Sequence, residues 1–342
     1  MPTNEPNQGN NTPTNEPKQV NNMPTFTLSE LQKSATQYQR ELLILPIKGA
    51  EKTLQHMQPY AGLTGDIVLS SLEGDAELAP YSSSRKDKGN FNIKPRTLEL
   101  QLGNCAYDFD PNELFGSIFG NGDFNAQGEA MKDADINADV LRLVAARLGR
   151  KLNGAIFGGV RRDGGTTTKD LFDGFDKITD KEIAATTIKA DLGNYVAVKA
   201  ITASNAIDEM QRIYDAMDDD LKDQPTKIFC SHDVYTAYCR NYQLLHGALP
   251  YNTEYKKTYL EGSDGLAEFV PLSSKKGSSY IHIAPQSNMC YGFGAGVNPA
   301  ERMAVEKYQP WMLTLEAVLS FGVQFRSIAK EHLLVAKVGA LS

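Results

Sequence analysis

Two stretches of alternating apolar and polar residues, separated by a strongly polar segment, constrain the fold of this chain most. The first is GDIVLSSLEG at 65–74, and the second is TLELQLGNCAYDF at 97–109. Alternation of this kind predicts two half-buried strands joined as a long hairpin. Two strands alone bury too little apolar surface to be stable in water. We therefore expect the hairpin to lie on another surface, with a charged tip formed by Arg85, Lys86, Asp87 and Lys88.

A long amphipathic helix is predicted over 133–153. Acidic residues crowd its start and basic residues crowd its end, an order that suits the helix dipole. Asn153-Gly154 is a typical helix stop, so we expect the helix to end there. Its apolar positions recur at helical spacing, and the predicted core face consists of Leu141, Val144, Leu148 and Leu152.

The remaining pattern mixes helices and strands and predicts an α+β fold. We expect a short helix at 28–38, an extended buried segment at 41–49, a helix at 204–217 capped by Ser204, and a helix capped by Ser231. Strands are predicted at 226–230, 278–285, 288–294, 311–329 and 332–338. The first 25 residues, rich in Pro, Asn and Thr, have almost nothing apolar to bury, so alone they are expected to be disordered.

Composition excludes several classes of protein. Lys and Arg total 35 against 42 Asp and Glu, which gives a net charge of −7. A domain whose main task is to neutralise nucleic-acid phosphates is usually basic. No apolar run approaches the roughly 20 residues that cross a bilayer, so an integral membrane protein is not expected. Four cysteines in a chain of 342 residues are too few for a disulfide scaffold.

No catalytic residue, cofactor site or metal site is predicted. Cys230, Ser231, His232 and Asp233 stand in a row, but catalytic triads assemble from residues distant in sequence. A strand end followed by a capped helix explains the same residues. A hydrolase that uses Cys230 or Ser231 with a distant histidine, His246 or His282, remains the alternative from another class. The cysteines lack paired zinc-ligand spacing, and the glycines at 158–165 and 292–296 lack the Walker and dinucleotide patterns.

The order of these parts resembles that of the major capsid protein of tailed bacteriophages, which has the Hong Kong 97-like fold. The resemblance covers 27–338 and rests on element order. It implies a polar N-terminal arm at 1–27, an N-arm helix and extended segment at 28–61, and an E-loop hairpin at 62–105. It further implies a peripheral domain with the spine helix at 106–191, an axial domain at 192–296, and peripheral strands with the C-terminus at 297–342.

The resemblance implies a structural protein, not an enzyme. Such proteins self-assemble into hexamers and pentamers of an icosahedral shell around double-stranded DNA, in the cytoplasm of a bacterial host. The implied partners are other copies of the chain, a portal, a scaffold and the packaged DNA, without cofactor or membrane. The E-loop tip, Arg85 to Lys88, would contact a neighbouring subunit. An encapsulin-type nanocompartment, which shares the fold, is the runner-up.

Overall fold

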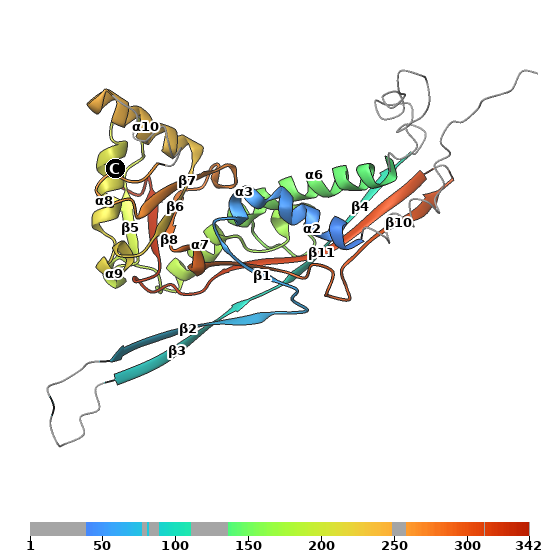
Figure 1. The fold of residues 1–342 in the computed structure, drawn as a ribbon, viewed down its shortest axis with the longest axis horizontal. Helices are drawn as coiled ribbons and strands as arrows, with labels where there is room; N and C mark the ends of the chain where they lie inside the picture. Colours follow the sequence, from blue (N-terminus) through green and yellow to red (C-terminus); the bar gives the residue numbers. More distant parts are fainter. Residues whose placement is uncertain are drawn as a thin grey trace, which may run out of the picture.

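The computed structural model describes residues 39–76, 81, 89–110, 136–247, 258–310 and 312–341. These form an elongated body from which one hairpin projects (Figure 1). The helices are α2 (Gln39–Gly49), α3 (Glu51–Leu54), α6 (Ile136–Gly158), α7 (Phe175–Ala184), α8 (Ala206–Asp215), α9 (Asp219–Lys222) and α10 (His232–His246). The predicted helix at 28–38 lies outside the described residues.

The first sheet is organised around the 14-residue strand β11 (Met312–Phe325), which pairs antiparallel with three other strands. Its neighbours are β4 (Gln101–Phe109), β10 (Arg302–Gln309) and β9 (Met289–Phe293), and β9 pairs parallel with β1 (Gln58–Ala61). The predicted strands at 288–294 and 311–329 are confirmed here. The sequence pattern missed β1 and β10.

The second sheet has the order β5-β12-β8-β6-β7 and forms the other end of the body (Figure 1). Its strands are β5 (Tyr195–Val198), β12 (Leu334–Val338), β8 (Tyr280–Ala284), β6 (Thr226–Ser231) and β7 (Ala267–Leu272). The apolar faces of α8 and α10 pack on it through Met210, Ile213 and Tyr238. The Ser231 cap of α10 is confirmed, since its hydroxyl accepts from the backbone N–H of Val234 at 3.3 Å. The cap predicted at Ser204 is wrong by one residue, because Asn205 precedes α8.

Helix α6 runs five residues beyond its predicted end. Asn153 and Gly154 do not stop it, because the apolar face continues through Ala155, Ile156 and Phe157, all fully buried. Burial of these side chains outweighs the helix-breaking tendency of one glycine, which is about 1 kcal/mol.

The prediction of an extended segment at 41–49 is wrong. These residues belong to α2, despite Pro46 inside it. A proline within a helix costs about 3 kcal/mol. Leu42 and Leu43, both buried against residues of α6 and the first sheet, supply the compensating contacts.

The single strand predicted at 97–109 is also wrong. The structure divides it into β3 (Gly89–Leu98), which pairs with β2 (Ile67–Ala76), and β4, which pairs with β11. The break lies at Glu99 and Leu100, where the chain crosses β11 so closely that only a glycine, Gly322, fits beneath the Glu99 carbonyl.

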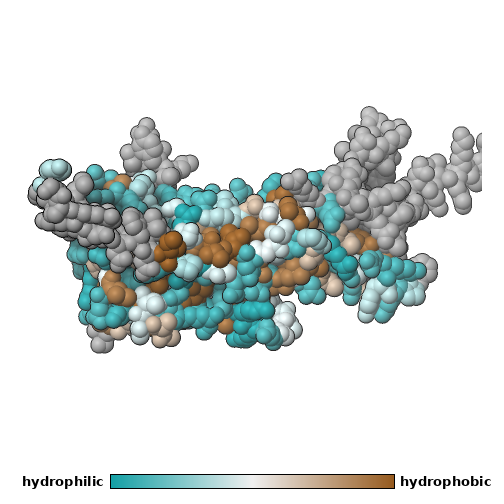
Figure 2. All heavy atoms as spheres, turned by 90° about the horizontal axis from the view of Figure 1, so that it is seen from below, coloured by the Kyte–Doolittle hydropathy of each residue, from teal (hydrophilic) through white to brown (hydrophobic). Residues whose placement is uncertain are grey.

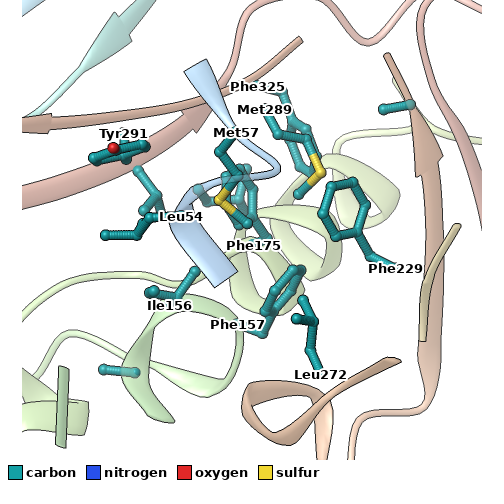
Figure 3. Packing of buried hydrophobic residues seen from close by; sticks show 14 of the residues in the cluster. Leu54, Met57, Ile156, Phe157, Phe175, Phe229, Leu272, Met289, Tyr291 and Phe325 are labelled. Atoms are coloured by element: carbon teal, nitrogen blue, oxygen red, sulfur yellow. The ribbon is translucent and has the colours of Figure 1, made fainter. Parts of the chain in front are cut away.

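A central core joins the two sheets where α6 ends and α7 begins. Figure 3 shows Phe157 of α6, Phe175 of α7, Phe229 of β6 and Phe325 of β11 converging there. The Phe157 ring lies 5.5 Å from that of Phe175 and 6.0 Å from that of Phe229, measured between centroids. Because strands from both sheets contribute to one aromatic cluster, the two ends of the body share a core.

Candidate subunit interface

The β2–β3 hairpin extends away from the body as an isolated two-stranded sheet (Figure 1). Its register pairs Val68 with Thr97 and Ser70 with Pro95, which places these residues on one face, and Ile93, two residues before Pro95, lies on the same face. Val68 is 64% exposed and Ile93 is 62% exposed. We call this the outer face of the hairpin. Apolar β-branched side chains on an exposed sheet face favour contact with another surface.

The opposite face of the hairpin is anchored to the body at its base. Leu69 and Leu98 are buried there with Cys290 of β9. The Arg96 guanidinium donates to the Phe325 carbonyl at 3.1 Å and forms an ion pair with Glu182 of α7 at 2.5 Å. The base is therefore fixed by packing and by a charge-assisted hydrogen bond, while the outer face is exposed.

Apolar residues are also exposed on the side of the molecule that carries the hairpin (Figure 2). Figure 2 views the molecule from the hairpin side and shows an apolar band along the middle of this face. The first sheet also has exposed large apolar side chains, which are Leu102 and Tyr107 of β4 and Tyr308 of β10. Extended apolar surface of this kind is typical of protein–protein contacts.

The predicted site residues are placed as follows. Arg85, Lys86, Asp87 and Lys88 at the hairpin tip lie outside the described residues. On α6, Val144 and Leu148 are partly buried beside the first sheet, and Leu152 is buried in the central core. Leu141 lies within the helix, between Ile136 and Gly158.

A buried polar cluster links α7 to the second sheet near the central core. The ammonium of Lys275, in the short helix η3 (Ser273–Lys275), is fully buried. Its three N–H groups have three acceptors: Asp176 Oδ1 at 2.8 Å, His282 Nδ1 at 2.8 Å and Ser278 Oγ at 3.1 Å. The Phe157 ring adds a cation–π contact, 4.4 Å from Nζ to the centroid. The cation is fully satisfied, and it links η3, α7 and β8.

The same cluster determines the tautomer of His282. An ammonium only donates, so Nδ1 must accept from Lys275. The ring proton therefore sits on Nε2 and is donated to Thr179 Oγ1 at 2.9 Å. Burial, with a smaller effect of the Lys275 charge, holds the pKa of His282 well below its ordinary value of 6.5. Burial also lowers the pKa of Lys275, and the Asp176 carboxylate opposes that shift. Sequence spacing gave no sign of this cluster, because its members come from three separate elements.

The hydrolase candidates do not form a reactive pair. Cys230 is fully buried, and burial raises its pKa to about 12, so it remains a thiol. On β6 its neighbour Phe229 pairs with His282. Phe229 belongs to the central core and Cys230 to the cluster beneath α8 and α10, so Cys230 and His282 face opposite sides of the sheet. His246 is the last residue of α10, about 21 Å along the helix from its start.

The described residues also lack the arrangement of a metal site. Within them, no three His, Cys, Asp or Glu side chains converge on one point. In the acidic run at 218–220, Asp218 accepts from the Asp220 backbone N–H at 3.2 Å and from Lys330 at 2.7 Å, so its carboxylate is already paired within the protein. Nor is any helix in the described part of the chain long and apolar enough to cross a bilayer.

A cavity of about 490 Å³ lies between α2, α6 and the first sheet. Leu43, Leu148 and Phe321 contribute apolar lining, and Arg161 and Thr167 contribute polar lining. The buried carboxylate of Glu301, also in this lining, accepts from the backbone N–H groups of Gly296 and Ser320. Its charge is thus already satisfied by the protein.

Comparison with known proteins establishes the fold. No protein-family model and no curated protein matches the sequence. The structure is similar to a chain of the satellite phage P4 procapsid that includes the size determination (Sid) protein, with a TM-score of 0.54 and 11% identity over 87% of this chain and 91% of that one. It is also similar to the capsid of a native GTA particle, with a TM-score of 0.55 and 13% identity over 85% and 91% of the two chains. A chain of Microbacterium phage Oxtober96 gives a TM-score of 0.51 and 13% identity over 83% and 90%.

These chains are matched over most of their length, so the likeness concerns the whole architecture. The protein has the Hong Kong 97-like capsid fold, and the expected fold is confirmed.

Proposed function

We propose that this chain is the major shell protein of a tailed-phage-type capsid. The observation that carries the proposal is the β2–β3 hairpin, whose base is anchored through Arg96 and whose apolar outer face at Val68 and Ile93 is exposed. In a fold shared with capsid proteins, a second copy of the chain is the natural partner for this face.

The proposal includes the parts expected from the sequence. Hexamers and pentamers close an icosahedral shell around double-stranded DNA, assembled in a bacterial cytoplasm with a portal and a scaffold. The first sheet with α6 corresponds to the peripheral domain, and the second sheet with α8 and α10 to the axial domain. With this assignment, β9 lies in the expected axial range 192–296 but pairs with β11 of the first sheet, and β12 lies in the expected peripheral range 297–342 but pairs with β5 and β8 of the second sheet. The proposal therefore assigns β9 to the peripheral domain and β12 to the axial domain. The basic residues Arg85, Lys86 and Lys88 contact a neighbouring subunit.

Electron microscopy combined with size-exclusion chromatography tests the proposal. The wild-type protein should form closed shells, tubes or capsomer rings. The double variant Val68→Lys/Ile93→Lys should fold, with an unchanged far-UV circular dichroism spectrum, but remain unassembled. Leu192→Lys, at an exposed apolar residue of the short helix η2 (Ala190–Leu192), serves as the control and should assemble.

Normal shells from the double variant would remove the hairpin face from the proposal. A wild-type protein that stays monomeric, even with the scaffold gene co-expressed, would contradict the proposed function itself. Particle contents separate the two shell classes: nuclease-protected DNA supports a phage capsid, and an enclosed enzyme without DNA supports an encapsulin-type compartment.

A further inference from the structure

Five exposed basic side chains lie on two neighbouring helical segments. Lys48 lies in the last turn of α2, Lys52 lies in α3, and Arg147, Arg150 and Lys151 lie in α6. None of the five forms an ion pair with another described residue, and we call them the basic face.

Three contacts show that α2–α3 and α6 run parallel and in register. Arg142 pairs with Glu41 at 3.3 Å. Gly49 and Gly149 meet so closely that a Cβ on Gly149 would lie 2.8 Å from the Gly49 Cα. Thr53 Oγ1 lies 2.6 Å from Asn153 Oδ1. A constant offset of about 100 residues therefore relates the two segments. At a rise of 1.5 Å per residue, the five basic side chains fall within about 8 Å along the helix axes.

The basic face points away from the first sheet. Leu42 and Leu43 of α2 and Ala145 of α6 are buried together against Val305 and Leu315 of that sheet. Both segments thus rest on the sheet with one side and expose the other. Among the described charged side chains of α2, α3 and α6, six are basic, and two, Glu41 and Glu51, are acidic. Glu41 is paired with Arg142, so the face carries a local positive charge on a chain of net charge −7.

We infer that the basic face binds the phosphate backbone of nucleic acid, and that it is therefore the inner face of the shell. The inference rests on the proposed function. Unpaired Lys and Arg side chains at close spacing match a duplex, which carries one phosphate charge per about 1.7 Å of axis. Contacts of this type position a backbone without reading base sequence. An acidic molecule with one basic face also has a defined orientation toward DNA.

Salt-dependent binding of a fluorescent DNA duplex tests the inference. It is measured on the unassembled full chain, separated from shells by size-exclusion chromatography, so that the basic face is accessible. Each lost phosphate contact should reduce the slope of log K against log salt by about 1. The variant Arg147→Gln/Arg150→Gln/Lys151→Gln should lose about 3 in slope and on the order of a hundredfold in affinity near 0.1 M salt. The matched control, Lys199→Gln/Lys276→Gln/Lys307→Gln, removes three exposed cations elsewhere and should keep the wild-type slope.

Equal slopes for the two triple variants would overturn the inference, as would a wild-type protein that does not bind the duplex at about 20 mM salt. A triple variant that loses binding to anionic lipid vesicles but keeps its DNA affinity would also overturn it. Electron microscopy of the same preparations before that separation keeps the two proposals apart. Normal shells from the Arg147 triple variant with weakened DNA binding support the inference. Absence of shells in all samples contradicts the proposed function. The salt slopes of the two triple variants can still be compared in that case, so the DNA-binding inference is tested separately.

Discussion

The close approach of α2 and α6 depends on the absence of a side chain at Gly149. A Cβ there would lie 2.5 Å from the Pro46 carbonyl oxygen and 2.8 Å from the Gly49 Cα, both rigid backbone atoms. Gly149→Ala should therefore push the helices apart. We expect the free energy of unfolding in urea to fall by about 1–3 kcal/mol.

Gly154→Ala in the same helix is the matched control. Nothing lies within 4 Å of a Cβ at Gly154, so only helix propensity changes, and stability should rise by up to about 1 kcal/mol. If both variants shift the unfolding midpoint in the same direction, the close contact at Gly149 is not a determinant of stability.

His282 should make stability depend on pH. Its pKa is held well below 6.5 in the folded protein, so below pH 6.5 the unfolded chain binds a proton that the folded protein does not. The free energy of unfolding should then decrease as pH falls, by about 1.4 kcal/mol per pH unit from this group. Between pH 7.5 and 5, the wild type should lose more stability than His282→Gln does. Parallel curves for the two proteins in urea titrations would contradict the buried neutral ring.

At the scale of elements, Arg96 determines whether the hairpin stays fixed to the body. Its guanidinium connects β3 to the Phe325 carbonyl, to Gln324 at 3.2 Å and to Glu182 of α7. Arg96→Met should leave the body intact but loosen the hairpin base. Hydrogen–deuterium exchange should accelerate about tenfold or more in β2 and β3 and remain unchanged in the buried part of α6.

Thr97→Val, on the exposed outer face of the same strand, is the control for that measurement and should not change exchange. Faster exchange across the whole body in Arg96→Met would indicate that Arg96 supports the global fold instead of the hairpin.

The elements that the sequence predicted are those with a long, regular pattern. The strand at 65–74 and the helix at 133–153 repeat one period over many residues, and the structure contains both, as β2 and α6. Helix α2 was missed because Pro46 contradicts helix locally, and its compensation comes from α6 and the first sheet, which are distant in sequence. The end of α6 was misplaced for a similar reason, since Phe157 extends the helix through contacts with Phe175 and Phe229.

At the scale of the whole molecule, the candidate interface was only partly predictable. The alternating pattern predicted a hairpin that must pack on another surface to be stable. The sequence interpretation assigned the contact with the neighbouring subunit to the charged tip, which lies outside the described residues. The exposed apolar face at Val68 and Ile93 follows from the β2–β3 register. That register could not be read from the sequence. The Lys275 cluster and the basic face depend on pairs such as Gly49 with Gly149 and Lys275 with Asp176, about 100 residues apart in the chain.

The shared core predicts that the two sheets unfold together. Cys230 lies in the second sheet and Cys290 in the first, and both are buried, with burial raising their pKa to about 12 and about 11. Neither thiol should react in the folded protein, because reaction requires exposure and the thiolate. Since Phe229 and Val335 of one sheet pack in the same cluster as Tyr291 and Phe321 of the other, opening either sheet exposes that cluster.

Pulse labelling with a thiol reagent over a urea series, read by mass spectrometry, should give one midpoint for both cysteines. Labelling of Cys290 at clearly lower urea than Cys230 would mean that the first sheet unfolds on its own and that the central core does not couple the two ends of the molecule.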